Sequence, residues 1–172
     1  MKRIVAVVLL IVLSLTFFTS CGEKTLNVDT DALIEKIVAD YKMENGFVFT
    51  SSSQNLGEYL DEDLIISYYG DATEYPDFSK ISKYCVYVDE SDPKLITDVG
   101  IFEMGDTEYA ETFMKFIKAR IDAKIADGLA YSDIDVATLK KAVIKQKANY
   151  VYYAVGKDSS DIVKDIESEL GK

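Results

Sequence analysis

Two pairs of apolar segments constrain the fold of this 172-residue chain more than any other feature. Residues 83–89 and 97–104 are rich in β-branched and aromatic residues, and a polar turn containing Pro93 separates them. Residues 142–147 and 150–155 form a second pair with a two-residue connection. Short segments of strand-forming residues joined by tight polar turns favour antiparallel hairpins. The sequence therefore predicts a four-stranded antiparallel sheet made of two hairpins.

Amphipathic helices are predicted before, between and after these hairpins. Apolar residues recur at helical spacing in four stretches, residues 29–41, 56–69, 107–128 and 156–170, and a brief helix is expected near 134–140. Residues 50–55 are expected to form a loop. The order α-α-β-β-α-β-β-α, with no Pro- or Gly-rich linker, predicts an α+β fold in one globular domain, residues 29–172.

The N-terminus has the features of an export signal. Lys2 and Arg3 precede an apolar run over residues 4–18, which as a helix would reach about 22 Å. The hydrocarbon core of a bilayer is roughly 30 Å thick, so the run is short for a spanning helix and suits a signal peptide. The small residues Thr19 and Ser20 then lead into Cys21 and a glycine.

This order resembles the lipobox of bacterial lipoproteins. The resemblance implies a diacylglyceryl thioether on Cys21, a cleaved signal peptide over residues 1–20 and a tether over residues 21–28. The expected location is the extracytoplasmic side of the cell membrane, with the membrane contacted through the lipid anchor. Two alternatives remain open: ordinary secretion after cleavage within Ser20-Cys21-Gly22, and an uncleaved anchor.

Composition excludes several classes of function. The chain carries 19 basic and 30 acidic residues, a formal charge of −11, which argues against nucleic acid as a partner. It has no histidine, the commonest general base and transition-metal ligand, and no Gly-x-Gly phosphate loop, so we expect no cofactor and no metal. If Cys21 is acylated, Cys85 has no partner for a disulfide within the chain and is interpreted as a small buried residue.

Two uses of the acidic residues can be considered. Asp71, Glu74 and Asp77 lie in one loop and Asp89, Glu90 and Asp92 in another, but neither has the ligand spacing of a calcium-binding EF-hand loop. A pair of carboxyl groups could also serve an envelope hydrolase, which would require one of them to be desolvated with a raised pKa. A solvated acidic surface is the simpler interpretation of both loops.

Tyrosine is abundant, with twelve residues and no tryptophan. In the last predicted strand Tyr150 and Tyr152 share one face, and Tyr87 of the first strand could lie beside them. If helices cover only the opposite face, these three tyrosines stand outward as a candidate binding surface. The alternative is that helices cover this face as well.

The arrangement of several short motifs resembles a known family. These motifs are Cys21-Gly22, Val28-Asp29, Tyr69-Gly70, residues 98–102 and residues 149–155. Together they resemble the lipoproteins grouped as domain of unknown function 4358, found chiefly in clostridia-like Gram-positive bacteria, over nearly all of the mature chain. The resemblance implies a lipid-anchored surface protein and supplies no catalytic residue. The expected function is a non-enzymatic binding or accessory module for a protein or small-molecule ligand; the alternatives are a carboxylate-dependent envelope enzyme and a sensor partner of a membrane protein.

Overall fold

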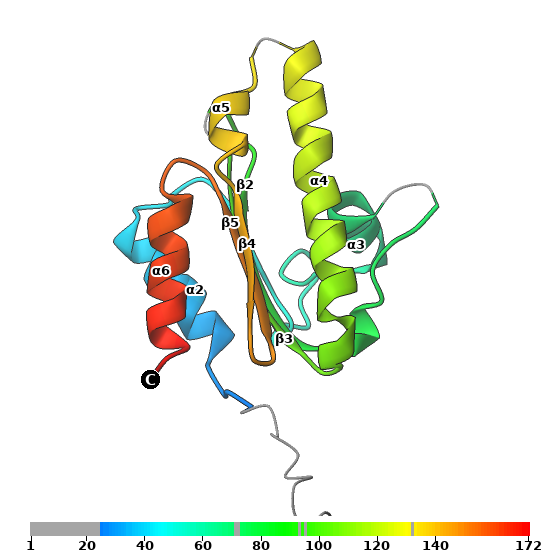
Figure 1. Cartoon of the computed structure of the whole chain (residues 1–172), viewed down its shortest axis with the longest axis vertical. Helices are drawn as coiled ribbons and strands as arrows, with labels where there is room; N and C mark the ends of the chain where they lie inside the picture. Colours follow the sequence, from blue (N-terminus) through cyan, green and yellow to red (C-terminus); the bar gives the residue numbers. More distant parts are fainter. Residues whose placement is uncertain (1–24, 71–72, 93, 95, 132) are drawn as a thin grey trace, which may run out of the picture.

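A five-stranded antiparallel sheet forms the centre of the molecule in the computed structural model, which describes residues 25–70, 73–92, 94, 96–131 and 133–172 (Figure 1). The strand order is β1-β2-β3-β5-β4. The strands are β1 (Phe47–Thr50), β2 (Ile81–Asp89), β3 (Thr97–Met104), β4 (Val143–Lys147) and β5 (Tyr150–Val155). The α-helices are α2 (Thr30–Asp40), α3 (Glu62–Tyr69), α4 (Ala110–Ala130), α5 (Val136–Leu139) and α6 (Ser159–Glu169).

The α+β class and both hairpins are confirmed, but the predicted number of strands is wrong. Strands β2 and β3 form the first hairpin and β4 and β5 the second, and β3 pairs with β5 to join them. The additional strand, β1, pairs antiparallel with β2 at the sheet edge. It escapes sequence analysis because it is only four residues long and an edge position leaves Phe47 and Val48 exposed, which hides the alternation of a half-buried strand.

Helices cover both faces of the sheet. Helices α3 and α4 lie on one side and α2 and α6 on the other, so that the sheet is the middle of three layers (Figure 1). The α4 side buries Phe113 and Ile117 against Phe102 and Val151. The opposite side buries Ile34, Ile37, Ile162 and Ile166 against alternate residues of the same strands, since successive side chains of a strand point to opposite faces.

The expectation of an exposed tyrosine surface is therefore wrong. Tyr87, Tyr150 and Tyr152 are at most 2 % exposed and pack beneath α2 and α6. The physical reason is that each of these helices carries an apolar stripe that must be buried, and this face of the sheet is where it fits. The three rings belong to the core and offer no binding surface.

Acidic residues begin most of the helices. Asp29 accepts hydrogen bonds from the backbone N–H groups of Asp31 and Ala32, both at 3.1 Å, which confirms the expected start of the first helix. Asp61 caps α3 in the same way, so that helix starts later than the expected residue 56. The longest helix continues two residues beyond Gly128, its expected end. Caps of this kind satisfy N–H groups that have no partner within the helix.

The described part of the expected tether is attached to the sheet. Asn149 accepts a hydrogen bond from the Leu26 N–H at 2.9 Å and donates one to the Leu26 carbonyl at 3.2 Å. The Val28 N–H donates to the Tyr150 hydroxyl at 2.9 Å. The folded domain thus begins by residue 26, three residues before the expected boundary. The predicted signal peptide and Cys21 lie outside the described residues.

Candidate functional site

The acidic loops singled out in the sequence serve local structure. Asp77 and Asp89 each accept hydrogen bonds from a serine two residues later, and Glu90 contacts Arg120 and Lys124. Asp71 lies outside the described residues. Among the residues that the structure describes, no group of three possible ligands is arranged to hold a metal ion.

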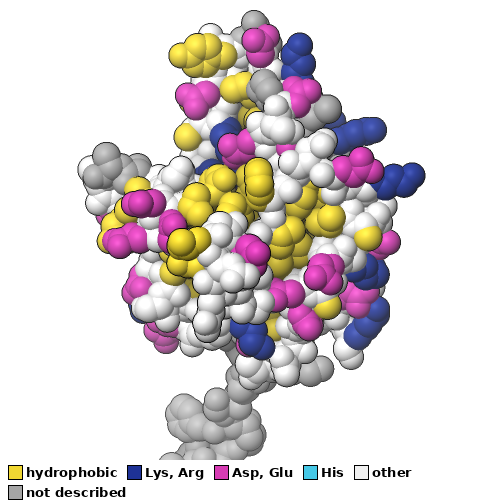
Figure 2. Space-filling view, turned by 180° about the vertical axis from the view of Figure 1, so that it is seen from behind, with side chains coloured by type: hydrophobic (Ala, Val, Ile, Leu, Met, Phe, Trp, Pro, Cys, Tyr) yellow, Lys and Arg dark blue, Asp and Glu magenta, His cyan; other side chains and the backbone are white. Residues whose placement is uncertain are grey.

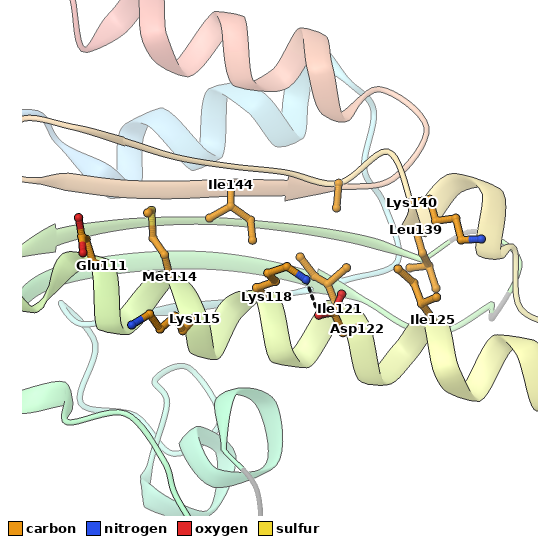
Figure 3. A pocket seen from close by; sticks show the side chains of 11 residues that line it. Glu111, Met114, Lys115, Lys118, Ile121, Asp122, Ile125, Leu139, Lys140 and Ile144 are labelled. Atoms are coloured by element: carbon orange, nitrogen blue, oxygen red, sulfur yellow. Dashed lines mark hydrogen bonds and ion pairs between the residues drawn. The ribbon is translucent and has the colours of Figure 1, made fainter.

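A groove lies between α4 and the edge strand β4. It has a volume of about 700 Å³, within the range of small-ligand sites. Figure 3 shows it from close by, with α4 along one side and β4 along the other and α5 at one end. Its apolar lining consists of Met114, Ile121, Ile125, Leu139, Ala142 and Ile144. We call it the α4–β4 groove.

The groove lies where the apolar stripe of α4 continues beyond its fully buried part. Phe113 and Ile117 are fully buried on the sheet. Met114 and Ile125 belong to the same stripe, pack against this core and stay half-buried. Since β4 is the last strand of the sheet, no further strand among the described residues covers them. Met114 and Ile144 point into the space between helix and strand (Figure 3).

Charged side chains border this apolar floor. Glu111, Lys115, Lys118, Asp122 and Lys140 are the charged residues of the groove. Lys118 is paired with Asp122, whereas Lys115 and Lys140 form no ion pair within the described chain. The groove thus has more basic than acidic side chains, in a chain whose net charge is −11.

The strand that borders the groove is also basic. Residues 139–149 contain four lysines and no acidic residue. On the α6 side of β4, Lys145 forms an ion pair with Glu167 at 2.6 Å, and Lys147 donates to the Glu167 carbonyl at 3.0 Å. Lys145 thus pairs with the Glu167 carboxylate, while within the described chain Lys147 donates only to a backbone carbonyl, and the local charge remains positive.

A second concavity lies between α3 and α4, above a buried charge. Arg120 donates from Nη1 to the Tyr68 carbonyl at 3.0 Å and stacks over the Tyr68 ring at 4.5 Å. From Nε and Nη2 it donates to Asp98. The Tyr153 hydroxyl donates to the other Asp98 oxygen at 2.6 Å. This hollow has a volume of about 380 Å³, and Arg120 is part of its lining. The hydrogen bonds of Arg120 already go to other residues of the domain.

Burial sets the protonation of this cluster. It raises the pKa of Tyr153 well above the usual value, and the Asp98 charge adds to the effect, so the phenol keeps the proton it donates. Burial alone would lower the pKa of Arg120, but Asp98, Tyr153, Tyr69 and Glu90 together outweigh it and the pKa rises. The guanidinium and the phenol both stay protonated, which suits an element that holds α4 on the sheet rather than one that exchanges protons.

Apolar side chains are also exposed at the other edge of the sheet. Phe47 and Leu56 are 68 % and 85 % exposed on β1 and the loop that follows it. Seen from behind, the molecule shows hydrophobic side chains gathered in the middle of the face among acidic ones (Figure 2). The β1 edge is partly closed, because the Thr50 N–H donates to the Glu58 carbonyl of that loop.

Comparison with known families decides part of the resemblance. Residues 77–156 match DUF4358, a domain of unknown function. The DUF4358 match contains β2 to β5, α4 and α5, and with them every residue of the α4–β4 groove. Helices α2, α3 and α6 lie outside it. No curated protein and no solved structure matches the chain.

Sequence analysis missed the groove although its signals were present. Met114 and Ile125 lie within the predicted helix 107–128 and Ile144 within the predicted strand 142–147, but which strand forms the sheet edge depends on the pairing of β3 with β5. The lysine-rich stretch 139–149 was the remaining clue.

In the described ranges, no helix combines the length and the apolar character needed to cross a bilayer.

Proposed function

We propose that this protein is a lipid-anchored module on the extracytoplasmic side of the cell membrane, and that it binds a partner molecule in the α4–β4 groove. The proposed location is supported by the N-terminal segment, which has a basic start, an apolar run too short to span a bilayer, and Cys21 directly after small residues. An anchor on Cys21 would stand only five residues before Leu26, where the chain joins the sheet. The domain would therefore be held close to the membrane surface.

The binding role is supported by the groove itself. An apolar floor bordered by Lys115 and Lys140, which form no ion pair with any described residue, suits a ligand that has an apolar part and a negative charge. Met114, Ile125 and Ile144 stay only partly buried at the groove although Phe113 and Ile117 of the same α4 stripe are fully buried, so apolar surface remains accessible there. This is the observation that carries the proposal.

The enzyme alternative has less support. A general acid working near neutral pH needs a raised pKa. Side-chain hydrogen bonds instead lower the pKa of six carboxyl groups, those of Glu58, Asp77, Asp106, Asp135, Glu167 and Glu169. The sensor alternative is compatible with the groove, because a membrane protein could supply the ligand.

The address is tested by mass spectrometry of the protein purified from membranes of its native host. We expect a mature chain beginning at Cys21 with the added mass of a diacylglyceryl group, and loss of membrane association in Cys21→Ser. A chain that keeps Met1, or a Cys21 without acyl mass, would contradict the address.

The groove is tested with the dye 8-anilinonaphthalene-1-sulfonate, which joins an aromatic body to an anionic sulfonate. We expect saturable fluorescence enhancement with the wild type. The affinity for the dye should be at least tenfold weaker in Met114→Glu and in Ile144→Glu. Leu56→Glu is the matched control, because it places the same charge on an exposed apolar residue at the other edge. Equal affinity in all four proteins would refute the groove as a binding site.

A further inference from the structure

The backbone of β4 has an open side. At the end of β3 the Met104 N–H donates to the carbonyl of Asn149, the residue before β5, so Asn149 directs its backbone groups toward β3. The next residue, Tyr150, therefore directs its backbone groups toward β4. Tyr150 pairs with Lys147 in the β4–β5 register. Because hydrogen-bonding direction alternates along an antiparallel strand, Lys145 and Lys147 bond to β5, while Ile144 and Gln146 direct their N–H and C=O groups away from the sheet. Within the described chain no strand pairs with that side.

This open side lies directly beside the α4–β4 groove. Ile144 belongs both to the edge and to the groove lining (Figure 3). A further strand added to β4 would hydrogen-bond to Ile144 and Gln146 and place alternate side chains over Met114 and Ile125. Addition of a peptide strand to a free sheet edge, with pockets for every second side chain, is a recurrent mode of recognition.

Charge indicates the kind of strand that fits. The other alternate side chains of an added strand would face the α6 side of β4, beside Lys145 and Lys147. Lys145 pairs with the Glu167 carboxylate, whereas Lys147 donates to the Glu167 backbone carbonyl and forms no ion pair with a described residue. Opposite charges on neighbouring strands stabilise pairing and like charges oppose it. A second copy of this chain would bring the lysines of two β4 strands together on one face, which disfavours self-pairing through this edge.

We propose that the β4 edge accepts an extended segment of a partner protein in which apolar and acidic residues alternate. The apolar side chains occupy the α4–β4 groove and the acidic ones pair with the lysines of β4. This inference rests on the proposed function, since it names the occupant of the same groove.

The test uses the peptide acetyl-Glu-Val-Glu-Val-Glu-Val-Glu-amide and the mature protein, with binding measured by titration calorimetry. Gln146→Pro removes one outward N–H, at a place where proline is tolerated in an edge strand. Gln146→Thr is the matched control, because it keeps the N–H. We expect binding to the wild type and to Gln146→Thr, and at least tenfold weaker binding to Gln146→Pro. The same peptide with N-methylated valines should also bind at least tenfold more weakly, which tests the backbone contacts without altering the protein.

The outcomes separate this inference from the proposed function. Absence of peptide binding, or equal binding by the N-methylated peptide, overturns strand addition, while dye binding that depends on Met114 would leave the groove standing. Equal dye affinity in the wild type and in all three Glu variants would refute both the groove as a binding site and the inference of strand addition. A concentration-dependent dimer that Gln146→Pro dissociates would show that a second copy occupies the edge, and this too overturns the inference.

Discussion

The guanidinium of Arg120 donates two hydrogen bonds to one oxygen of Asp98, from Nε at 3.0 Å and from Nη2 at 2.7 Å. The two side chains are 6 % and 1 % exposed and join α4 to the centre of the sheet. Glu90 contacts the same guanidinium from the β2–β3 turn at 2.9 Å. This pair fixes the position of the helix that forms one wall of the groove.

Removing one member of this buried pair should be costly. Arg120→Met leaves the Asp98 charge buried without its main partner, and we expect a loss of about 3–5 kcal/mol in the free energy of unfolding. Lys164→Met breaks the exposed pair with Asp161 and should change stability little, because solvent screens that pair. Urea unfolding followed by circular dichroism measures both; similar losses would contradict the structural role given to Arg120.

The attachment of the N-terminal segment can be tested at Tyr150. Its hydroxyl accepts from the Val28 N–H at 2.9 Å and donates to the Val28 carbonyl at 3.3 Å. Tyr150→Phe should cost about 1–2 kcal/mol and speed hydrogen exchange at the Val28 amide. Tyr150→Ala should cost about 3–5 kcal/mol because the ring is fully buried. Tyr131→Ala, at an exposed ring, should change stability by less than about 0.5 kcal/mol; a comparable loss there would argue against the assigned burial.

The charge cluster predicts a dependence of stability on pH. Burial acts to raise the pKa of Glu90, but Lys124 and Arg120 outweigh it and lower the pKa below the ordinary 4.5. A folded-state pKa below the unfolded one stabilises the fold above the unfolded pKa, and this contribution is lost as the pH falls through the folded pKa. Wild type should therefore exceed Glu90→Gln in unfolding free energy at pH 7, and the gap should close as the pH falls below 4.5 and through the lower folded-state pKa. A gap that stays constant from pH 7 to pH 3 would refute this.

The fold was predictable from sequence where the pattern is local. The hairpins of β2–β3 and β4–β5 follow from strand-forming residues around short turns, and the start of α2 follows from Asp29. The short edge strand β1 was missed because exposure of Phe47 and Val48 removes the alternation on which the prediction depends.

The site was not predictable because it depends on long-range arrangement. Tyr150 and Tyr152 look like surface residues only if one face of the sheet is bare, and the positions of α2 and α6 decide that. The groove likewise depends on β4 being an edge strand, which follows from the pairing of β3 with β5. The sequence contains the apolar and basic residues of the site, but their neighbours in space come from the topology.

The open edge of β4 is tested most directly by residue-resolved amide hydrogen exchange. The account predicts an alternation: slow exchange at Lys145 and Lys147, fast exchange at Ile144 and Gln146, and slowing of the latter two when the alternating Glu-Val peptide is added. Uniform protection along β4 in the free protein, or no slowing at Ile144 and Gln146 with saturating peptide, would contradict it.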